Sequence, residues 1–168
     1  ILQQDMVEAC FEALECALTQ GDRKRVRAWL DEVKSVRVGG VDVQGRQALA
    51  KALWERRYGD PAQSLELFES AVRFLDESGE ADLRWRARGY WAEALAILGK
   101  GPEAAEVLTA AKELLDGITR KVPTDFIDSW LARPELADLA RIGQVVAQVS
   151  AQDRAKVLSG GEDPKWRR

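Results

Sequence analysis

The run from Arg84 to Trp91 gathers the residues with the most evident chemistry, three arginines close to two tryptophans. Arginine contacts phosphate and tryptophan stacks on bases, so this composition is one that sites for single-stranded nucleic acid use. At about 100° per residue on a helix, however, Arg86 lies on the side away from Arg84 and Arg88. The arginines form no continuous stripe, and we expect no nucleic-acid partner.

The other reactive side chains do not combine into a catalytic or metal site. The chain has no His and no Asn, which excludes His-dependent triads and His-bearing zinc sites. Cys10 and Cys16 are separated by about 9 Å of helical rise, too far for a disulfide, and we expect two buried thiols. Pairs of carboxylates such as Glu66 and Glu69 lie among polar residues as solvated charge. We therefore expect no enzyme, no cofactor and no metal.

Composition agrees with one domain or a short repeat array. Of 168 residues, 46% are hydrophobic, and 25 basic against 28 acidic residues give a net charge of −3. No strongly one-signed block favours nucleic acid or an anionic membrane, and no apolar run has membrane-spanning length. Because the chain starts without Met and shows no signal-peptide pattern, we interpret it as a piece of a longer cytoplasmic protein.

The elements that position these residues are expected helices, and the clearest pair spans residues 83–115. Apolar residues recur there at steps of three and four, first along 83–98 and then along 104–115. Between them Gly99 suits the left-handed end of a helix, and Pro102 suits the first turn of the next. The pattern predicts a helical hairpin, with this stripe on its first helix: Leu83, Ala87, Tyr90, Trp91, Ala94, Leu95 and Leu98.

The hairpin is repeated twice before this point. A first helix at 3–19 has an apolar face of Met6, Cys10, Ala13, Leu14 and Ala17, and Asp22 suits the N-cap of a helix at 23–36. In the second copy Asp60, Pro61 and Gln63 form an N-cap, first helical residue and capping-box position. One spacing recurs on each second helix: Val26-x3-Leu30-x2-Val33, Ser64-x3-Phe68-x2-Ala71 and Ala104-x3-Leu108-x2-Ala111.

Trp91-Ala92-x-x-Leu95 and Ala104-x3-Leu108-x2-Ala111 resemble a tetratricopeptide repeat, which sets large residues beside small ones so that two helices approach closely. An ordinary helical bundle with alanines at its contacts is the alternative. The turn glycines Gly21, Gly59 and Gly99 recur after 38 and 40 residues, longer than the ideal repeat. Such a period resembles the long-helix arrays of large bacterial signalling proteins.

The residues from 118 to 160 change character. Thr124 suits the cap of a short helix, Pro134 opens another, and a capping box at Ser150 and Asp153 predicts a separate last helix. The run from Val122 to Leu136 resembles segments that close helical arrays in bacterial enhancer-binding transcriptional regulators and in Ser/Thr kinases. We expect capping helices at 118–160 and the start of a linker at 161–168.

These patterns predict an all-α superhelical array of three tetratricopeptide-like hairpins (1–38, 41–79 and 81–117) with a C-terminal helical cap. The resemblance implies a protein-interaction or signal-sensing module of a larger bacterial regulator, and a self-association module is the alternative. Without Asn, the carboxylate clamp of chaperone-binding repeats is excluded. We expect a monomer that binds a protein or peptide segment in a concave groove lined by Glu8, Phe11, Glu15, Arg86, Gly89, Glu93 and Ile97.

Overall fold

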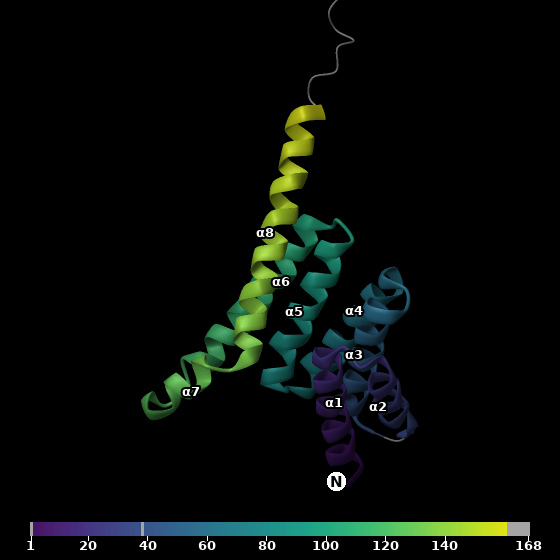
Figure 1. Ribbon diagram of the computed structural model, residues 1–168. Helices are drawn as coiled ribbons and strands as arrows, with labels where there is room; N and C mark the ends of the chain where they lie inside the picture. The colour runs from purple at the N-terminus through teal and green to yellow at the C-terminus, as the bar shows by residue number, and fades with distance from the viewer. Residues whose placement is uncertain (1, 38, 161–168) are drawn as a thin grey trace, which may run out of the picture.

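A computed structural model describes residues 2–37 and 39–160, and this part of the chain is helical without strands (Figure 1). The expected all-α fold is confirmed at this level. The expected linker at 161–168 lies outside the described residues. The helices are α1 (Leu2–Gln20), α2 (Arg23–Ser35), α3 (Val41–Tyr58), α4 (Pro61–Ser78), α5 (Ala81–Ile97), α6 (Gly101–Thr119), the 3₁₀ turn η1 (Thr124–Phe126), α7 (Ile127–Leu131) and α8 (Pro134–Gly160).

Helices that follow one another in the chain pack in adjacent pairs, α1 with α2, α3 with α4 and α5 with α6. The first helices of these pairs also meet, because α1 contacts α3 and α3 contacts α5. The long helix α8 returns along α5 and α6, and the short α7 extends away from the body at the base of α8 (Figure 1). Two apolar cores result, one mainly within α1 to α4 and one within α5, α6 and α8.

The helix ends follow the capping residues that the sequence contains. Asp22 Oδ1 accepts from the Arg25 N–H at 3.1 Å, and Asp60 Oδ1 accepts from the Ala62 N–H at 2.9 Å. The expected capping box does not form at Asp60, because its own N–H donates to Glu55 Oε2 at 2.9 Å and not to Gln63. Gly99 has φ +75°, the left-handed conformation in which glycine alone has no steric cost, whereas Gly59 turns with φ −115°.

The buried face of α1 differs from the expected one by a rotation of about one residue. Phe11, expected as an exposed side chain, is only 2% exposed and belongs to the core. Met6, expected inside, is 42% exposed. The reason is that α1 packs on both α2 and α3, which favours the stripe with the larger residues inside. Cys10 is buried as expected, but Cys16 lies on the exposed side.

Helix α5 is buried on most sides because α3, α4, α6 and α8 all pack against it. Trp85, considered above only as a stacking residue, is 1% exposed and fills the second core. At the other end of the helix, Leu98 is 38% exposed although the periodicity placed it in the buried stripe. Leu98 follows the last residue of α5, where the chain already turns toward Gly99.

The last helix is continuous from Pro134 to Gly160, so the break predicted at Ser150 and Asp153 is wrong. These two residues instead lie against the start of α6. A Cβ atom added at Gly101 would lie 2.6 Å from Asp153 Oδ2 and 3.4 Å from Ser150 Cα. Packing on α6 therefore uses the side chains that suggested a cap, and the helix runs on past them.

Candidate functional site

Ionic contacts join the first helices of the three pairs to one another and to α8. They lie on one side of α1, α3 and α5, the side that carries Glu15, Arg46, Arg86 and Glu93, and we call this side the inner face. Most of the residues expected to line a groove are on it. The structure shows that they are largely engaged with one another.

Arg46 on α3 connects the first and third pairs near one end of the inner face. Its side chain is 7% exposed and makes a two-pronged contact with Glu80, the N-cap residue of α5, with Nη2 2.7 Å from Glu80 Oε2. The same Nη2 lies 3.7 Å from Glu8 Oε2 on α1. Because a buried guanidinium without a carboxylate is costly, Glu80 fixes the start of α5 against α3.

Arg86 on α5 reaches across to α1, where its Nη2 donates to the Glu15 carboxylate. The Tyr90 hydroxyl donates to Glu15 Oε1 at 2.7 Å. Burial opposes the charged form of Arg86, but the adjacent Glu15 outweighs it, so the pKa of Arg86 is raised. Burial, and then the charge of Glu15, raises the pKa of Tyr90 as well. Both groups therefore hold their protons, and Glu15 is anchored between them.

Asp82, one turn before Arg86 on α5, links the inner face to the segment that precedes α8. Its two oxygens accept from Arg133 at 2.9 and 3.0 Å, and Trp85 Nε1 donates to Oδ1 at 3.2 Å. Burial alone raises the pKa of Asp82, but the hydrogen bonds from Arg133 outweigh burial and hold the pKa below its usual range. The carboxylate is therefore ionised, and it fixes the base of α8.

Glu93 is the most enclosed carboxylate of the inner face, with its side chain 11% exposed. One oxygen accepts from Arg56 Nη1 of α3 at 2.5 Å and the other from Arg141 Nη1 of α8 at 2.7 Å. The hydrogen bond to Glu93 raises the pKa of Arg141. Glu93 thus joins three helices and is closed to an external partner.

An open cleft lies beside this network, between the first half of α1, α3 and the start of α5. Its volume is about 240 Å³, and its apolar lining consists of the exposed Ala81 and the nearly buried Phe11 and Leu83. Both arginines in its wall, Arg46 and Arg86, are already paired with carboxylates. Its other polar lining consists of carboxylates on α1 and at the start of α5: Glu8, Glu12, Glu80 and Asp82. The cleft is therefore acidic, with an apolar floor.

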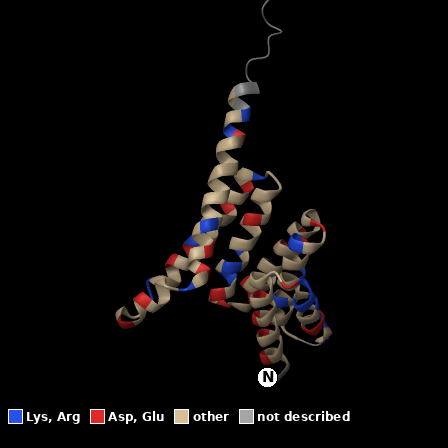
Figure 2. Cartoon of the chain, viewed as in Figure 1, with Lys and Arg blue, Asp and Glu red and all other residues tan. Residues whose placement is uncertain are grey.

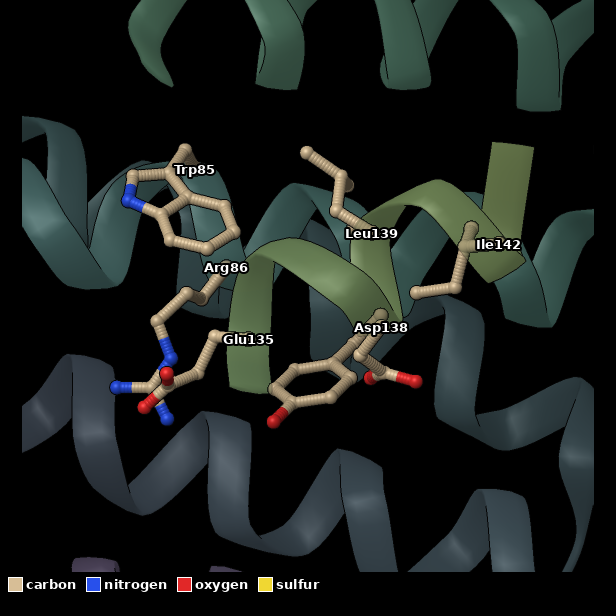
Figure 3. A pocket seen from close by; sticks show the side chains of 8 residues that line it. Trp85, Arg86, Glu135, Asp138, Leu139 and Ile142 are labelled. Atoms are coloured by element: carbon tan, nitrogen blue, oxygen red, sulfur yellow. The ribbon is translucent and has the colours of Figure 1, made fainter. Parts of the chain in front are cut away.

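Over α5 the inner face is covered by α8 (Figure 3). A Cβ atom added at Gly89 would lie 3.0 Å from Leu139 Cδ1 and 3.8 Å from Ile142 Cδ1, so the glycine lets α8 approach closely. In Figure 3, Glu135, Asp138, Leu139 and Ile142 of α8 stand opposite Trp85 and Arg86 of α5. The space left between them is about 10 Å³, enough for one water molecule.

The residues expected to line a groove therefore separate into three places. Glu8, Phe11 and Arg86 line the cleft, with Phe11 as its buried floor, and Glu15 supports Arg86 from α1. Gly89 and Glu93 lie under α8. Ile97 is 61% exposed at the end of α5 and does not line the cleft.

Sequence reasoning identified Arg86 but missed Arg46, Arg133 and Arg141, which also hold the inner face together. Arg46 lies at helical spacing from the buried Val43, Leu49 and Ala50, and a charged residue inside an apolar stripe signals a buried ion pair. Arg133 and Arg141 give no such signal, because their inner-face partners, Asp82 and Glu93, are more than forty residues away in the chain.

The site offers binding chemistry through carboxylates, arginines and apolar surface. Within residues 2–37 and 39–160, no group of three or more His, Cys, Asp or Glu side chains is arranged to hold a metal ion. No helix in that part of the chain combines the length and the apolar character that crossing a membrane requires.

Comparison with known proteins gave no match to this chain among protein-family models, curated proteins or solved structures.

Proposed function

We propose that this chain is a protein-interaction or signal-sensing module, built from tetratricopeptide-like hairpins, in a larger bacterial regulator of the cytoplasm. A transcriptional regulator and a Ser/Thr kinase are the two kinds of regulator that the sequence resemblance favours. The adjacent helix pairs support the proposal, as do Ala104, Leu108 and Ala111, the small and large residues of the repeat spacing, which are all buried on α6. We propose no catalytic role.

The observation that carries the proposal is the acidic cleft between α1, α3 and α5. Its arginines are neutralised internally, while Glu8 is 51% exposed and Glu12 makes no ion pair with any described residue. A ligand that covers the exposed Ala81 above Phe11 and Leu83 and brings a cation to Glu8 and Glu12 satisfies both features. The ligand we propose is a partner's peptide segment with a Lys or Arg beside an apolar residue.

The way α8 covers α5 illustrates this mode of recognition inside the chain. Leu139 and Ile142 pack on Gly89, and Arg141 donates to the inner-face carboxylate of Glu93. A helix with an apolar stripe and arginine at its margin thus already fits one part of the inner face. A partner helix of the same kind would occupy the part that remains open.

The experiment is binding of a fluorescein-labelled amphipathic helical peptide that carries arginines four residues apart, measured by fluorescence anisotropy. The double variant Glu8→Lys, Glu12→Lys should weaken binding by about tenfold or more, because two attractive contacts become repulsive. The matched control is the double variant Glu66→Lys, Glu69→Lys, which reverses two exposed carboxylates of α4. Its affinity for the peptide should stay within about twofold of wild type. Equal affinities of the two double variants would contradict the cleft as the binding site.

Self-association is the second candidate, and one observation favours it. Phe126 is 63% and Leu131 56% exposed on η1 and α7, which extend away from the body (Figure 1). Two such surfaces paired across a two-fold axis would bury both side chains. Sedimentation distinguishes the candidates: the interaction module should be monomeric over a wide concentration range, and a stable dimer that Phe126→Ser dissociates would favour self-association.

A further inference from the structure

A second charged surface lies where the end of α3 meets the start of α2, and the proposed function does not use it. It consists of Arg23, Lys24 and Arg27 on α2 with Trp54, Arg57 and Tyr58 on α3, and we call it the stacked-arginine patch. Arg46 in the wall of the cleft and Arg57 in the patch are separated by about 16 Å of helical rise along α3. The two surfaces are therefore at opposite ends of α3.

The patch is ordered by stacking. The half-buried rings of Trp54 and Tyr58 lie with their centroids 5.0 Å apart. The Cζ atom of Arg23 lies 5.8 Å from the Trp54 centroid and 5.6 Å from the Tyr58 centroid. Arg27 lies 5.4 Å from the Trp54 centroid, and Arg57 lies 5.9 Å from that of Tyr58. Aromatic faces attract guanidinium groups, so the rings hold the arginines at fixed positions on the surface.

The charges of the patch are not neutralised within the chain. Arg27 pairs with Asp31 at 3.3 Å, but Arg23, Lys24 and Arg57 are exposed and make no ion pair with any described residue. The arginines of the inner face, by contrast, all have carboxylate partners. A guanidinium that stacks by its face keeps its N–H edge available for a planar anion.

The charge of the surrounding helices is unevenly distributed, as Figure 2 shows. The sequence of α2, RKRVRAWLDEVKS, contains five Lys or Arg and two Asp or Glu. Its partner α1 contains four Asp or Glu and no Lys or Arg, and α4 contains four acidic residues and one Arg. Among the helices α1 to α4, the excess of positive charge therefore lies on α2 and α3.

From this geometry we propose that the stacked-arginine patch binds an acidic peptide segment of a partner protein. Arg23 and Arg57 both lie over the Tyr58 ring, which places their Cζ atoms no more than about 12 Å apart. Two carboxylates four residues apart on a helix have Cβ atoms about 6 Å apart and longer side chains beyond them, so one such pair reaches both guanidinium groups.

The limited extent of the patch favours a short acidic peptide over a nucleic acid. A nucleic-acid strand carries a phosphate at each nucleotide and would run on past the patch in both directions. On α2 it would meet Asp31 and Glu32, and beyond α3 it would meet Asp60 and the acidic α4. A peptide that places its few carboxylates at the patch avoids this repulsion.

The test uses a fluorescein-labelled helical peptide of about twelve residues with glutamates four residues apart on an alanine background, followed by fluorescence anisotropy. The double variant Arg23→Gln, Arg57→Gln should lower the affinity by about tenfold or more. The double variant Arg23→Lys, Arg57→Lys keeps the charge but loses the planar edge, and should lower the affinity by about threefold or more.

The matched control is Arg73→Gln with Arg120→Gln, which removes two exposed arginines outside the patch, one of them stacked on Phe74. It should bind the peptide within about twofold of wild type, and circular dichroism should show the same helix content in all variants. Three results would overturn the proposal: no saturable binding, full affinity in the lysine variant, or tighter binding of a single-stranded oligonucleotide of equal charge that is lost in the same glutamine variant.

Discussion

The inner face is open over α1 and α3 and covered over α5, although similar residues line both parts. Glu8 in the open part is 51% exposed and its nearest arginine is 3.7 Å away. Glu93 in the covered part is 11% exposed and accepts from two arginines. The difference comes from α8, whose Leu139 and Ile142 close on Gly89. Glu93 is thus closed to a partner by the helix that returns over it, whereas Glu8 stays exposed.

The largest effect should come from Phe11, because it decides whether the floor of the cleft is core or surface. We expect Phe11→Ala to lower the free energy of unfolding by about 3–5 kcal/mol, since the ring is 2% exposed and its removal leaves a cavity. Urea denaturation followed by circular dichroism measures this loss. Met6→Ala on the same helix, where the side chain is 42% exposed, should cost less than about 1 kcal/mol. Similar small losses in both variants would mean that the inner face of α1 is assigned to the wrong side.

The stability of the covered part of the inner face, where α8 packs on α5, should depend on Ile142. Ile142→Ala should cost about 2–5 kcal/mol by urea denaturation, because this side chain is 2% exposed within the second core. Leu158→Ala, farther along α8 where the side chain is 80% exposed, serves as the control and should cost less than about 0.5 kcal/mol. If Ile142→Ala were as mild as the control, α8 would not cover α5 in solution.

A smaller effect should follow from Glu93→Gln, which keeps the shape of the side chain but removes its charge. We expect a loss of about 1–3 kcal/mol, because two hydrogen bonds to a charged group become weaker and Arg56 is left largely buried. Arg141→Gln should cost less, since Arg141 is 51% exposed and its charge is screened by solvent. Equal losses in the two variants would show that the ion pair of Glu93 with Arg141 of α8 contributes as much to stability as its ion pair with Arg56 of α3.

The smallest effect concerns pH and Asp82. The folded-state pKa of this carboxyl lies below its usual range, so the unfolded chain takes up the proton first as the pH falls. The stabilisation from Asp82 should therefore be complete well above the unfolded pKa of about 3.9 and be lost as the pH falls through the lower folded value. Denaturation of wild type and Asp82→Asn should show a difference at pH 7 that shrinks below about pH 4. If the difference in unfolding free energy between the two proteins did not change with pH, the charge of Asp82 would not be the source of the stabilisation.

The sequence was informative wherever a structural feature is determined by neighbouring residues. Asp22, Asp60 and Gly99 mark helix ends because caps and left-handed turns depend on local backbone chemistry. The buried side of α1 was harder to predict, because Phe11 and Met6 both fit an apolar stripe and only the contact with two other helices decides between them. The period of the apolar pattern thus predicts a helix but does not determine which side of that helix is buried.

The candidate site could be predicted only in part, for a related reason. Glu8 and Arg86 were assigned to the side of their helices where the cleft lies. The closure over Gly89 and Glu93 had no local signal, since it depends on contacts with Leu139 and Arg141 roughly fifty residues later. Glycine at position 89 is uninformative until the helix that approaches it is known.

The continuity of α8 has a mechanical consequence. Its 27 residues form a rod about 40 Å long, and its base is fixed to α5 through Arg133 and Asp82 at the edge of the acidic cleft. Asp153 near its far end packs on the start of α6, and Leu158 lies only about 8 Å farther along the axis. Because Ile142 lies in the second core and Asp153 packs on the start of α6, α8 cannot tilt at its base without disturbing that core, and strain at the edge of the cleft is shared along most of the rod.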